Sequence, residues 1–388
     1  MIDRILLKNF RGFKELTIEN LSLYTIVSGT NNTGKSSLLE ALYFLFNHSK
    51  NDVFVQINSL RGGFSDPLIK VIQSMFYGNT LTEPLKISVF SFNENLKRAL
   101  TFGNREKQDQ FFVQTSNPLL DISNNNSNAA LSSLVTPLKI DYVENRLNKD
   151  SQAESKLYSE EIILDCPSPS SSQNSMQTPF GTQINFKYKT YPSGNLKDLL
   201  PTLLVNSSTF RNPFLLLELL GRIELLGRKD ELIGYLRSVE NDLTDIFSAT
   251  SDGITQLFIR LSRQSNAIPL KYAGDGVSRF LCIVCAVMIY SNGLILVDEI
   301  ENGLHYSVYD KLNHILSKIA QLNNTQVIVT THSYDFISSS LRSIKRNNSE
   351  NIFSLHRLDN SDPEGMIKDN YFDYEMAEYA VRTSLEIR

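Results

Sequence analysis

Residues 29–36 have the types and spacing of a phosphate-binding loop. They read Gly-Thr-Asn-Asn-Thr-Gly-Lys-Ser, in which the glycines let successive backbone N–H groups turn toward a phosphate. Lys35 supplies a cation for the β- and γ-phosphates of a nucleotide, and the hydroxyl of Ser36 can bind Mg²⁺. We therefore expect ATP and Mg²⁺ to bind here, with the nucleotide in contact with Asn31, Asn32, Thr33, Gly34, Lys35, Ser36 and Ser37.

The segments on either side of this loop support the prediction. An apolar run at 23–27 precedes it, and a run with helical periodicity at 37–46 follows it. The N-terminus of that helix would add its dipole and its free N–H groups to the anion site. A chance glycine-rich turn would require neither a strand before it nor a helix after it.

Two carboxylates end a second apolar run. Residues 294–297 read Leu-Ile-Leu-Val, and Asp298 and Glu299 follow directly. In this layout Asp298 would hold Mg²⁺ through its water shell, and Glu299 would orient and deprotonate the attacking water. A strand followed by Asp-Glu is a weak signal by itself, because such pairs are common at strand ends.

A histidine ends the next apolar run, in Thr330-Thr331-His332-Ser333. A histidine at the tip of a parallel strand, beside one that ends in Asp-Glu, can reach a γ-phosphate or the water that attacks it. A structural cap would explain His332 alone equally well, but three motifs in this order favour hydrolysis. We expect Lys35, Glu299 and His332 to be catalytic and Ser36 and Asp298 to bind the metal.

The composition is that of an ordinary globular protein. Of 388 residues, 41% are hydrophobic and 21% are charged, so a sizeable buried core is possible. The net charge of −4 gives no global positive field for nucleic acid, although a local basic face is compatible with it. The sequence starts without the layout of a signal peptide, and no apolar run approaches about 18 residues. We expect a cytoplasmic protein without a membrane-embedded part.

The three cysteines are too few for a disulfide framework. Cys282 and Cys285 are spaced Cys-x-x-Cys, but nearly all their neighbours in 280–290 are apolar and no second pair of ligands is present. We therefore predict a buried core helix for this stretch, not a metal or redox site.

Hydrophobic periodicity indicates how the chain is organised around the motifs. Residues 5–10 and 16–18 are predicted as a strand pair, and short alternating runs at 85–92, 110–114, 161–164 and 184–188 indicate an antiparallel β region. Polar tracts at 123–128 and 167–175 are predicted as loops. Helices are expected between 214 and 247 and near 276–290, 306–320 and 374–382, and a strand is expected at 326–329.

The motifs, together with Tyr-Ala-Gly-Asp-Gly-Val-Ser-Arg at 272–279, resemble the heads of ABC-type ATPases. The segments 297–305 and 8–13 are similar to the OLD-like and PARIS-type ATPases of bacterial anti-phage systems more than to transporters. The resemblance covers about 1–48 and 266–340. It implies an α/β fold, a P-loop ABC-type ATPase head with a mixed β-sheet. Its parts would be the N-terminal part of the head at 1–95, an inserted β-rich region at 96–200, a helical lobe at 201–265 and the C-terminal part of the head at 266–388.

The resemblance also implies that two heads dimerise with ATP between them. Gly274, Gly276 and Ser278 would lie near the start of a helix whose N–H groups meet the partner's γ-phosphate, and Arg11 would lie on the adenine side. Asp275 departs from the Ser-Gly-Gly pattern of transporters, and a carboxylate beside a phosphate needs a cation. His305 would either cross between the subunits or be an ordinary polar loop residue.

A glutamine that contacts Mg²⁺ is also expected after the P-loop helix, and both Gln56 and Gln73 are candidates. OLD proteins carry a TOPRIM nuclease after the ATPase, but too few residues follow Ser333 for one. We therefore expect an effector on a separate chain, either a TOPRIM-like nuclease or another toxin.

Three functions remain after this reasoning. The first is an ATPase that senses infection and regulates the separate effector of an anti-phage system. The second is a RecF-like or SMC-like DNA repair ATPase that binds DNA through a basic face, and the third is a nucleotide-gated scaffold with little hydrolysis. The candidates for the basic face are Arg342, Lys345, Arg346, Lys187 and Lys189.

Overall fold

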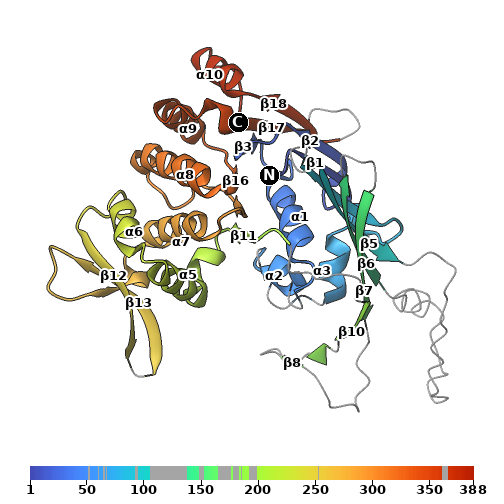
Figure 1. Ribbon diagram of the computed structural model, residues 1–388, viewed down its shortest axis with the longest axis horizontal. Coiled ribbons are helices and arrows are strands. Elements are labelled where there is room, and N and C mark those ends of the chain that lie inside the picture. Colours follow the sequence, from blue (N-terminus) through green and yellow to red (C-terminus); the bar gives the residue numbers. More distant parts are fainter. Residues whose placement is uncertain are drawn as a thin grey trace.

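A six-stranded sheet lies at the centre of the molecule (Figure 1). The computed structural model describes residues 1–50, 53–59, 61–63, 66, 68–91, 95–104, 138–147, 153–164, 176–177, 183–184, 186–191, 199–251, 253–360 and 366–388. In spatial order the strands are β11 (Thr202–Val205), β15 (Leu294–Val297), β16 (Gln326–Thr330), β3 (Tyr24–Gly29), β17 (Phe353–Asp359) and β18 (Lys368–Phe372). All neighbours are parallel except β17 and β18. The carboxyl ends of β3, β15 and β16 therefore meet at one edge of the sheet.

Both faces of this sheet are buried, which explains the nearly continuous apolar sequence of its strands. In β15, for example, Ile295 and Val297 pack into one core, whereas Leu294 and Leu296 pack into another. The first core contains the helices on one side of the sheet in Figure 1, which are α5 (Pro213–Leu225), α6 (Lys229–Leu236), α7 (Asp275–Ile289), α8 (Tyr309–Asn323), α9 (Tyr334–Arg346) and α10 (Tyr374–Arg382). The second core surrounds α1 (Lys35–Asn47) on the other side.

A seven-stranded antiparallel sheet covers the far side of α1. Its order is β10 (Phe186–Tyr191), β7 (Ala153–Leu164), β6 (Leu138–Leu147), β5 (Leu96–Asn104), β4 (Leu85–Ser91), β1 (Arg4–Phe10) and β2 (Phe13–Glu19). Strand β5, at the start of the region predicted as an insertion at 96–200, continues this sheet, because β5 pairs with β4 and β4 pairs with β1. The predicted strand at 110–114 and the loops at 123–128 and 167–175 lie outside the described residues.

The helical lobe predicted at 201–265 is only partly helical. Helices α5 and α6 form as expected, but β12 (Leu243–Ser251) and β13 (Ile254–Leu261) follow as a hairpin, extended by β14 (Ile268–Pro269). The prediction of helices up to Phe247 is wrong for β12. Its Leu243, Ile246 and the alternating threonines and serines after them suit a half-exposed strand, and Gly253 has the positive φ of a tight turn.

The remaining predicted elements agree with the structure. The helix expected near 276–290 is α7, in which Cys282 and Cys285 are fully buried, and burial raises the pKa of the Cys282 thiol to about 12. The helix expected at 306–320 is η6 (Tyr306–Val308) followed by α8. Short elements elsewhere are α2 (Val53–Ser59), α3 (Leu68–Ser74), η1 (Tyr77–Asn79), η4 (Thr209–Arg211), η5 (Leu270–Tyr272), η7 (Glu350–Ile352), β8 (Met176–Gln177) and β9 (Gln183–Ile184).

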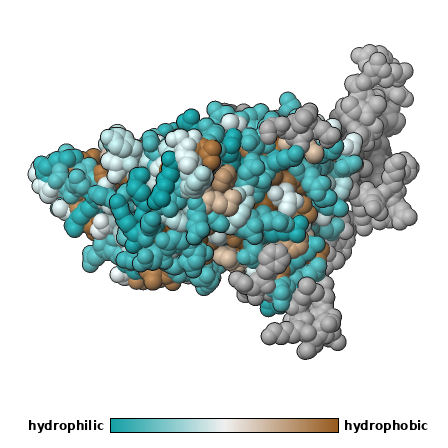
Figure 2. All heavy atoms as spheres, turned by 90° about the horizontal axis from the view of Figure 1, so that it is seen from above, coloured by the Kyte–Doolittle hydropathy of each residue, from teal (hydrophilic) through white to brown (hydrophobic). Residues whose placement is uncertain are grey.

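The outer surface is mainly polar where it can be seen. From above, in Figure 2, the described part of the molecule is largely hydrophilic and its hydrophobic residues gather in small separate groups. This agrees with helices such as α9, whose apolar side chains face the core. In the part of the chain that the structure describes, no helix has the length and apolar composition needed to cross a membrane.

Candidate nucleotide-binding site

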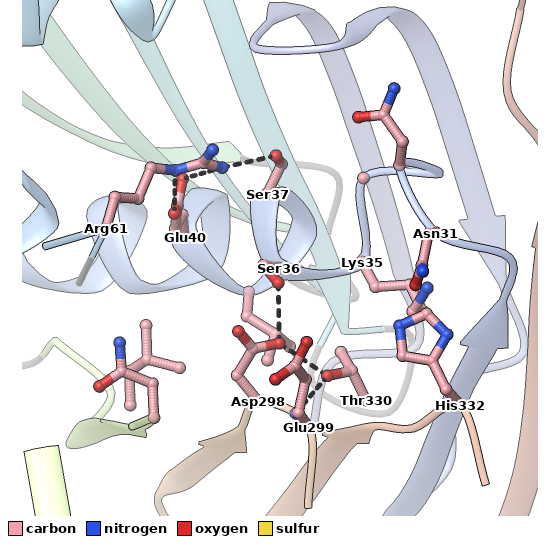
Figure 3. A pocket seen from close by; sticks show the side chains of 15 residues that line it. Asn31, Lys35, Ser36, Ser37, Glu40, Arg61, Asp298, Glu299, Thr330 and His332 are labelled. Carbon is pink, nitrogen blue, oxygen red and sulfur yellow. Dashed lines mark hydrogen bonds and ion pairs between the residues drawn. The ribbon is translucent and has the colours of Figure 1, made fainter. Parts of the chain in front are cut away.

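A cavity of about 520 Å³ opens where the carboxyl ends of β3, β15 and β16 meet (Figure 3). The three predicted motifs converge on it from positions nearly 300 residues apart in sequence. Its lining consists of Asn31, Asn32, Gly34, Lys35, Ser36, Ser37, Leu39, Glu40, Arg61, Leu204, Asn206, Asp298, Glu299, Thr330 and His332. Most of the predicted nucleotide, metal and catalytic residues therefore share one cavity of a size suited to a small-molecule ligand.

The loop between β3 and α1 has the shape of an anion cradle. Gly34 has a φ of 83°, and a Cβ there would lie 2.4 Å from the ring of Phe13, so only glycine fits. Within the described residues, no side chain caps the N-terminus of α1, which leaves its first N–H groups for a ligand. Thr33 does not line the cavity. Its hydroxyl donates to the Thr30 carbonyl oxygen at 2.9 Å and braces the loop from within.

Lys35 is held inside this loop, with only 5% of its surface exposed. Its Nζ donates to the carbonyl oxygens of Gly29 and Thr30, both at 2.8 Å. Burial lowers the pKa of the ammonium to about 8, although the nearby Asp298 and Glu299 carboxylates favour the charged form. An anionic ligand would add the partner that this partly desolvated cation lacks.

We expect the affinity for ATP to fall as the pH rises through about 8. With a pKa lowered to about 8, Lys35 is protonated below that pH and can pair with phosphate, whereas above it the neutral amine cannot. Calorimetric titration of the protein with ATP from about pH 7 to about pH 9 measures the effect. An affinity that stays constant or increases over this range would show that Lys35 keeps its charge.

The two predicted metal ligands, Ser36 and Asp298, are in direct contact at the cavity wall. The hydroxyl of Ser36 donates to Oδ1 of Asp298 at 2.9 Å, and Thr330 Oγ1 donates to the same carboxylate oxygen at 2.7 Å (Figure 3). A hydroxyl and a carboxylate are the hard oxygen donors that Mg²⁺ prefers, so this pair fits the ion. Neither candidate glutamine is among the described residues that line the cavity, and Gln56 hydrogen-bonds Tyr43 instead.

Glu299 and His332 lie beside this pair. Glu299 has a left-handed backbone with a φ of 47°, and its N–H donates to Thr330 Oγ1 at 2.8 Å. The N–H of His332 donates to Glu301 Oε1 at 2.7 Å, and its imidazole points toward Asn31 (Figure 3). Glu299 and His332 thus bring a carboxylate and an imidazole to the same cavity.

Arg61 lines the cavity although the sequence did not single it out, whereas Arg11 is not among the lining residues. Arg61 donates to Glu40 at 2.7 Å and to the hydroxyl of Ser37 at 3.1 Å. Arg11 does not line the cavity, because its guanidinium is buried against Glu40 at 3.0 Å and bonded to Ser74. The signal in the sequence was Glu40 itself, since a carboxylate on the buried face of an apolar helix needs cationic partners.

Gly274, Gly276 and Ser278 lie at the start of α7 and do not line the cavity. The role of Asp275, left open by the sequence, becomes clearer: Arg211 pairs with its carboxylate at 2.5 Å. His305 caps η6 by accepting a hydrogen bond from the Ser307 N–H at 3.4 Å. This contact agrees with an ordinary polar loop residue, and a contact of His305 across a dimer stays a prediction.

Comparison with known proteins gives matches over most of the chain. A family model described as "AAA domain, putative AbiEii toxin, Type IV TA system" matches residues 25–339, which include all three motifs. An "ATP/GTP phosphatase" of Helicobacter pylori is 28% identical over 351 residues, covering 87% of this chain and 86% of that protein. An uncharacterized protein of Methanocaldococcus jannaschii is 40% identical over 101 residues, covering 24% of this chain and 43% of that protein.

Among solved structures, an SMC head bound to the C-terminal winged-helix domain of ScpA superposes with a TM-score of 0.50. The identity is 11%, and the match covers 97% of this chain and 99% of that one. At this identity the likeness concerns the fold alone. It confirms the predicted class, a mixed α/β fold that resembles the ATPase heads of SMC and ABC proteins.

Proposed function

Since the chain belongs to this family of AAA domains and is an ATPase, we propose that two copies close around ATP and thereby regulate a separate effector protein. In this proposal the protein is the sensor of a bacterial anti-phage system of the OLD-like or PARIS type. The observation that carries it is a divided site. One set of predicted nucleotide residues lines the cavity, and the other set, at the start of α7, does not line it.

The start of α7 has the features of a surface that awaits a partner. Gly274 is exposed and has a φ of 94°, and Tyr272 beside it is 71% exposed. The loop at 303–306 packs against it, since a Cβ on Gly276 would lie 2.7 Å from the Gly303 carbonyl oxygen. Tyr306 in that loop is 69% exposed. Two large exposed aromatic side chains next to a helix N-terminus suit a second copy that brings its own nucleotide.

The chemistry within each cavity follows from the residues around it. Lys35 and the N–H groups of α1 would bind the phosphates, and Ser36 and Asp298 would hold Mg²⁺, which when bound offsets phosphate charge. Glu299 would accept a proton from the attacking water, and His332 would donate a hydrogen bond to the γ-phosphate or that water. Arg61 adds a partly exposed cation on the α1 side of the cavity.

Two of the comparisons support an effector on a separate chain. The description of the family names a toxin of a type IV TA system, which supports a role in a system with more than one component. The solved SMC head with a similar fold was crystallised with a second protein, ScpA. The test is a pull-down of Glu299→Gln protein with Mg·ATP from its native host. A stoichiometric partner with a nuclease or toxin domain supports the proposal, and repair factors with DNA contradict it.

The DNA repair alternative gains no support from the basic residues proposed for it. Arg342 and Arg346 pair with Asp310, at 3.3 and 2.7 Å, and Lys345 pairs with Glu378 at 3.1 Å. A cation that is already paired with a carboxylate neutralises DNA phosphates less effectively. Its binding to DNA therefore releases fewer counterions and adds less affinity. The side chains of Lys187 and Lys189 lie outside the described residues.

Replacing Tyr272 with glutamate is expected to prevent ATP-dependent dimerisation. The new carboxylate would have to be desolvated in the contact and would lie beside the partner's phosphates. Light scattering of the protein with Mg²⁺ and a non-hydrolysable ATP analogue gives the mass directly. Tyr379→Glu is the matched control, because Tyr379 is 64% exposed on α10, and it should dimerise like the wild type. A dimer of Tyr272→Glu would place the interface elsewhere.

A further inference from the structure

We propose that Arg279 is a positioning residue that ties the start of α7 to the catalytic carboxylate Glu299 of the same subunit. The inference rests on the proposed function, because it gives α7 a role in sensing the partner's nucleotide. Arg279 lies one turn into α7, and its side chain runs from that helix to the end of β15.

The contacts of Arg279 are directed at the backbone of the two acidic motif residues. Its Nη2 donates to the carbonyl oxygens of Asp298 and Glu299, at 2.6 and 2.7 Å. The guanidinium also lies 5.2 Å from the centre of the Phe210 ring. One side chain thus holds two consecutive carbonyl groups at the point where β15 ends and the motif begins.

This arrangement supports a backbone conformation that would otherwise be unfavourable. Glu299 has a φ of 47°, a left-handed conformation that residues other than glycine rarely adopt. Thr330 fixes the N–H of Glu299, and Arg279 fixes its carbonyl oxygen, so both ends of the residue are held. Asn302 donates a hydrogen bond to the Glu299 carboxylate, so the direction of this carboxylate depends on Asn302 at its tip and on Arg279 at its backbone.

A purely structural role does not account for an arginine at this position. Arg279 is only 1% exposed, and within the described residues its Nε has no hydrogen-bond partner. Burial lowers the pKa of this guanidinium, while Asp298 and Glu301 oppose that shift. An apolar side chain would fill the same space without the desolvation cost of a charge. What only the guanidinium provides is the pair of bonds to the motif backbone.

The consequence is a mechanical connection between the two halves of the divided site. Gly274 and Asp275, at the start of α7, lie one turn before Arg279 on the same rigid helix. A partner's nucleotide that shifts or orders this helix end would therefore shift the Glu299 backbone through Arg279. Hydrolysis in one cavity would then respond to nucleotide bound by the other subunit.

The test is Arg279→Met, read out as turnover and ATP affinity separately. Turnover should fall by about 100-fold, the size of loss that a misplacement of about 1 Å causes, while ATP affinity stays unchanged because the phosphate contacts are intact. In the Glu299→Gln background the same substitution should add no further loss, since Arg279 acts through the carboxylate that is already gone. Independent, multiplicative losses would overturn the proposal.

Two further variants keep the result interpretable. Arg228→Met is the matched control, because Arg228 donates to the Met288 carbonyl oxygen at the far end of α7, at 3.0 Å, and should affect stability without affecting turnover. Arg279→Lys retains a buried cation that can reach one carbonyl group. If Arg279→Met does not fold, Arg279→Lys should fold and show the same selective loss of turnover.

Failure of the inference differs from failure of the proposed function. If Glu299→Gln protein forms no dimer with ATP, the dimer model is wrong, whatever Arg279→Met does to turnover. If the dimer forms but Arg279→Met hydrolyses ATP at the normal rate, only the positioning role is wrong.

Discussion

Replacing Lys35 with alanine is expected to abolish ATP hydrolysis, with a loss of at least about 1000-fold in turnover. The ammonium lies between two loop carbonyl oxygens and is the only cation that the P-loop itself contributes among the described residues. Alanine would leave the phosphates without that charge and would also leave the two carbonyl oxygens without their donor. Phosphate release measured with purified protein tests the expectation.

The same variant should lose ATP affinity as well as turnover, because Lys35 would bind the phosphates before and during the reaction. Lys311→Ala is a suitable control, since Lys311 is exposed on α8 and away from the cavity. It should retain both activities. Normal hydrolysis by the Lys35→Ala protein would mean that the measured activity comes from another site or from a contaminant.

The motif residues could be located from the sequence because their chemistry is local. In the segment from β3 to α1, strand, turn and helix follow within 24 residues, Tyr24–Asn47, and each has its own pattern. The positions of Asp298 and His332 were predictable for a related reason. Parallel strands place whatever follows them at one edge, so two short apolar runs were enough to bring these residues to the P-loop.

Features that depend on distant pairing were not predictable in this way. Strand β4 lies beside β1, about 80 residues earlier in the chain, and β5 from the predicted insertion pairs with β4, and nothing local in the sequence shows these pairings. The β12–β13 hairpin was missed because short apolar runs suit a helix or a strand equally well until their pairing is known.

The contacts of Arg11 depend on Glu40, a residue about 30 positions later in the chain. The segment at 8–13 does form the turn between β1 and β2 next to the nucleotide loop. Glu40, on the buried face of α1, pairs with both Arg11 and Arg61, and of these two arginines Arg61 lines the cavity. Both arginines pair with this one buried carboxylate, and they differ in exposure: the Arg11 side chain is 8% exposed and the Arg61 side chain is 46% exposed.

Replacing Glu299 with glutamine is expected to preserve ATP binding and to lower turnover by about 100- to 10,000-fold, the usual contribution of a general base. Glutamine has nearly the same shape, so the left-handed backbone, the Arg279 bond and the Thr330 bond to residue 299 can all persist. The substitution removes the proton acceptor together with one negative charge near Lys35. Phosphate release and retention of unhydrolysed ATP after gel filtration measure the two effects separately.

Glu299→Gln protein with bound ATP also distinguishes the proposed ATP-driven switch from a nucleotide-gated scaffold with little hydrolysis. If ATP closes two copies around divided sites, Glu299→Gln protein should remain a dimer for as long as it holds ATP, and light scattering should show twice the monomer mass. Glu375→Gln, an exposed change on α10, should return to monomers as ATP is consumed. Unchanged turnover in Glu299→Gln would remove the carboxylate from the mechanism. If turnover is low but no dimer forms, Glu299 keeps its role as general base. The ATP-bound dimer is then wrong, and hydrolysis takes place within one subunit.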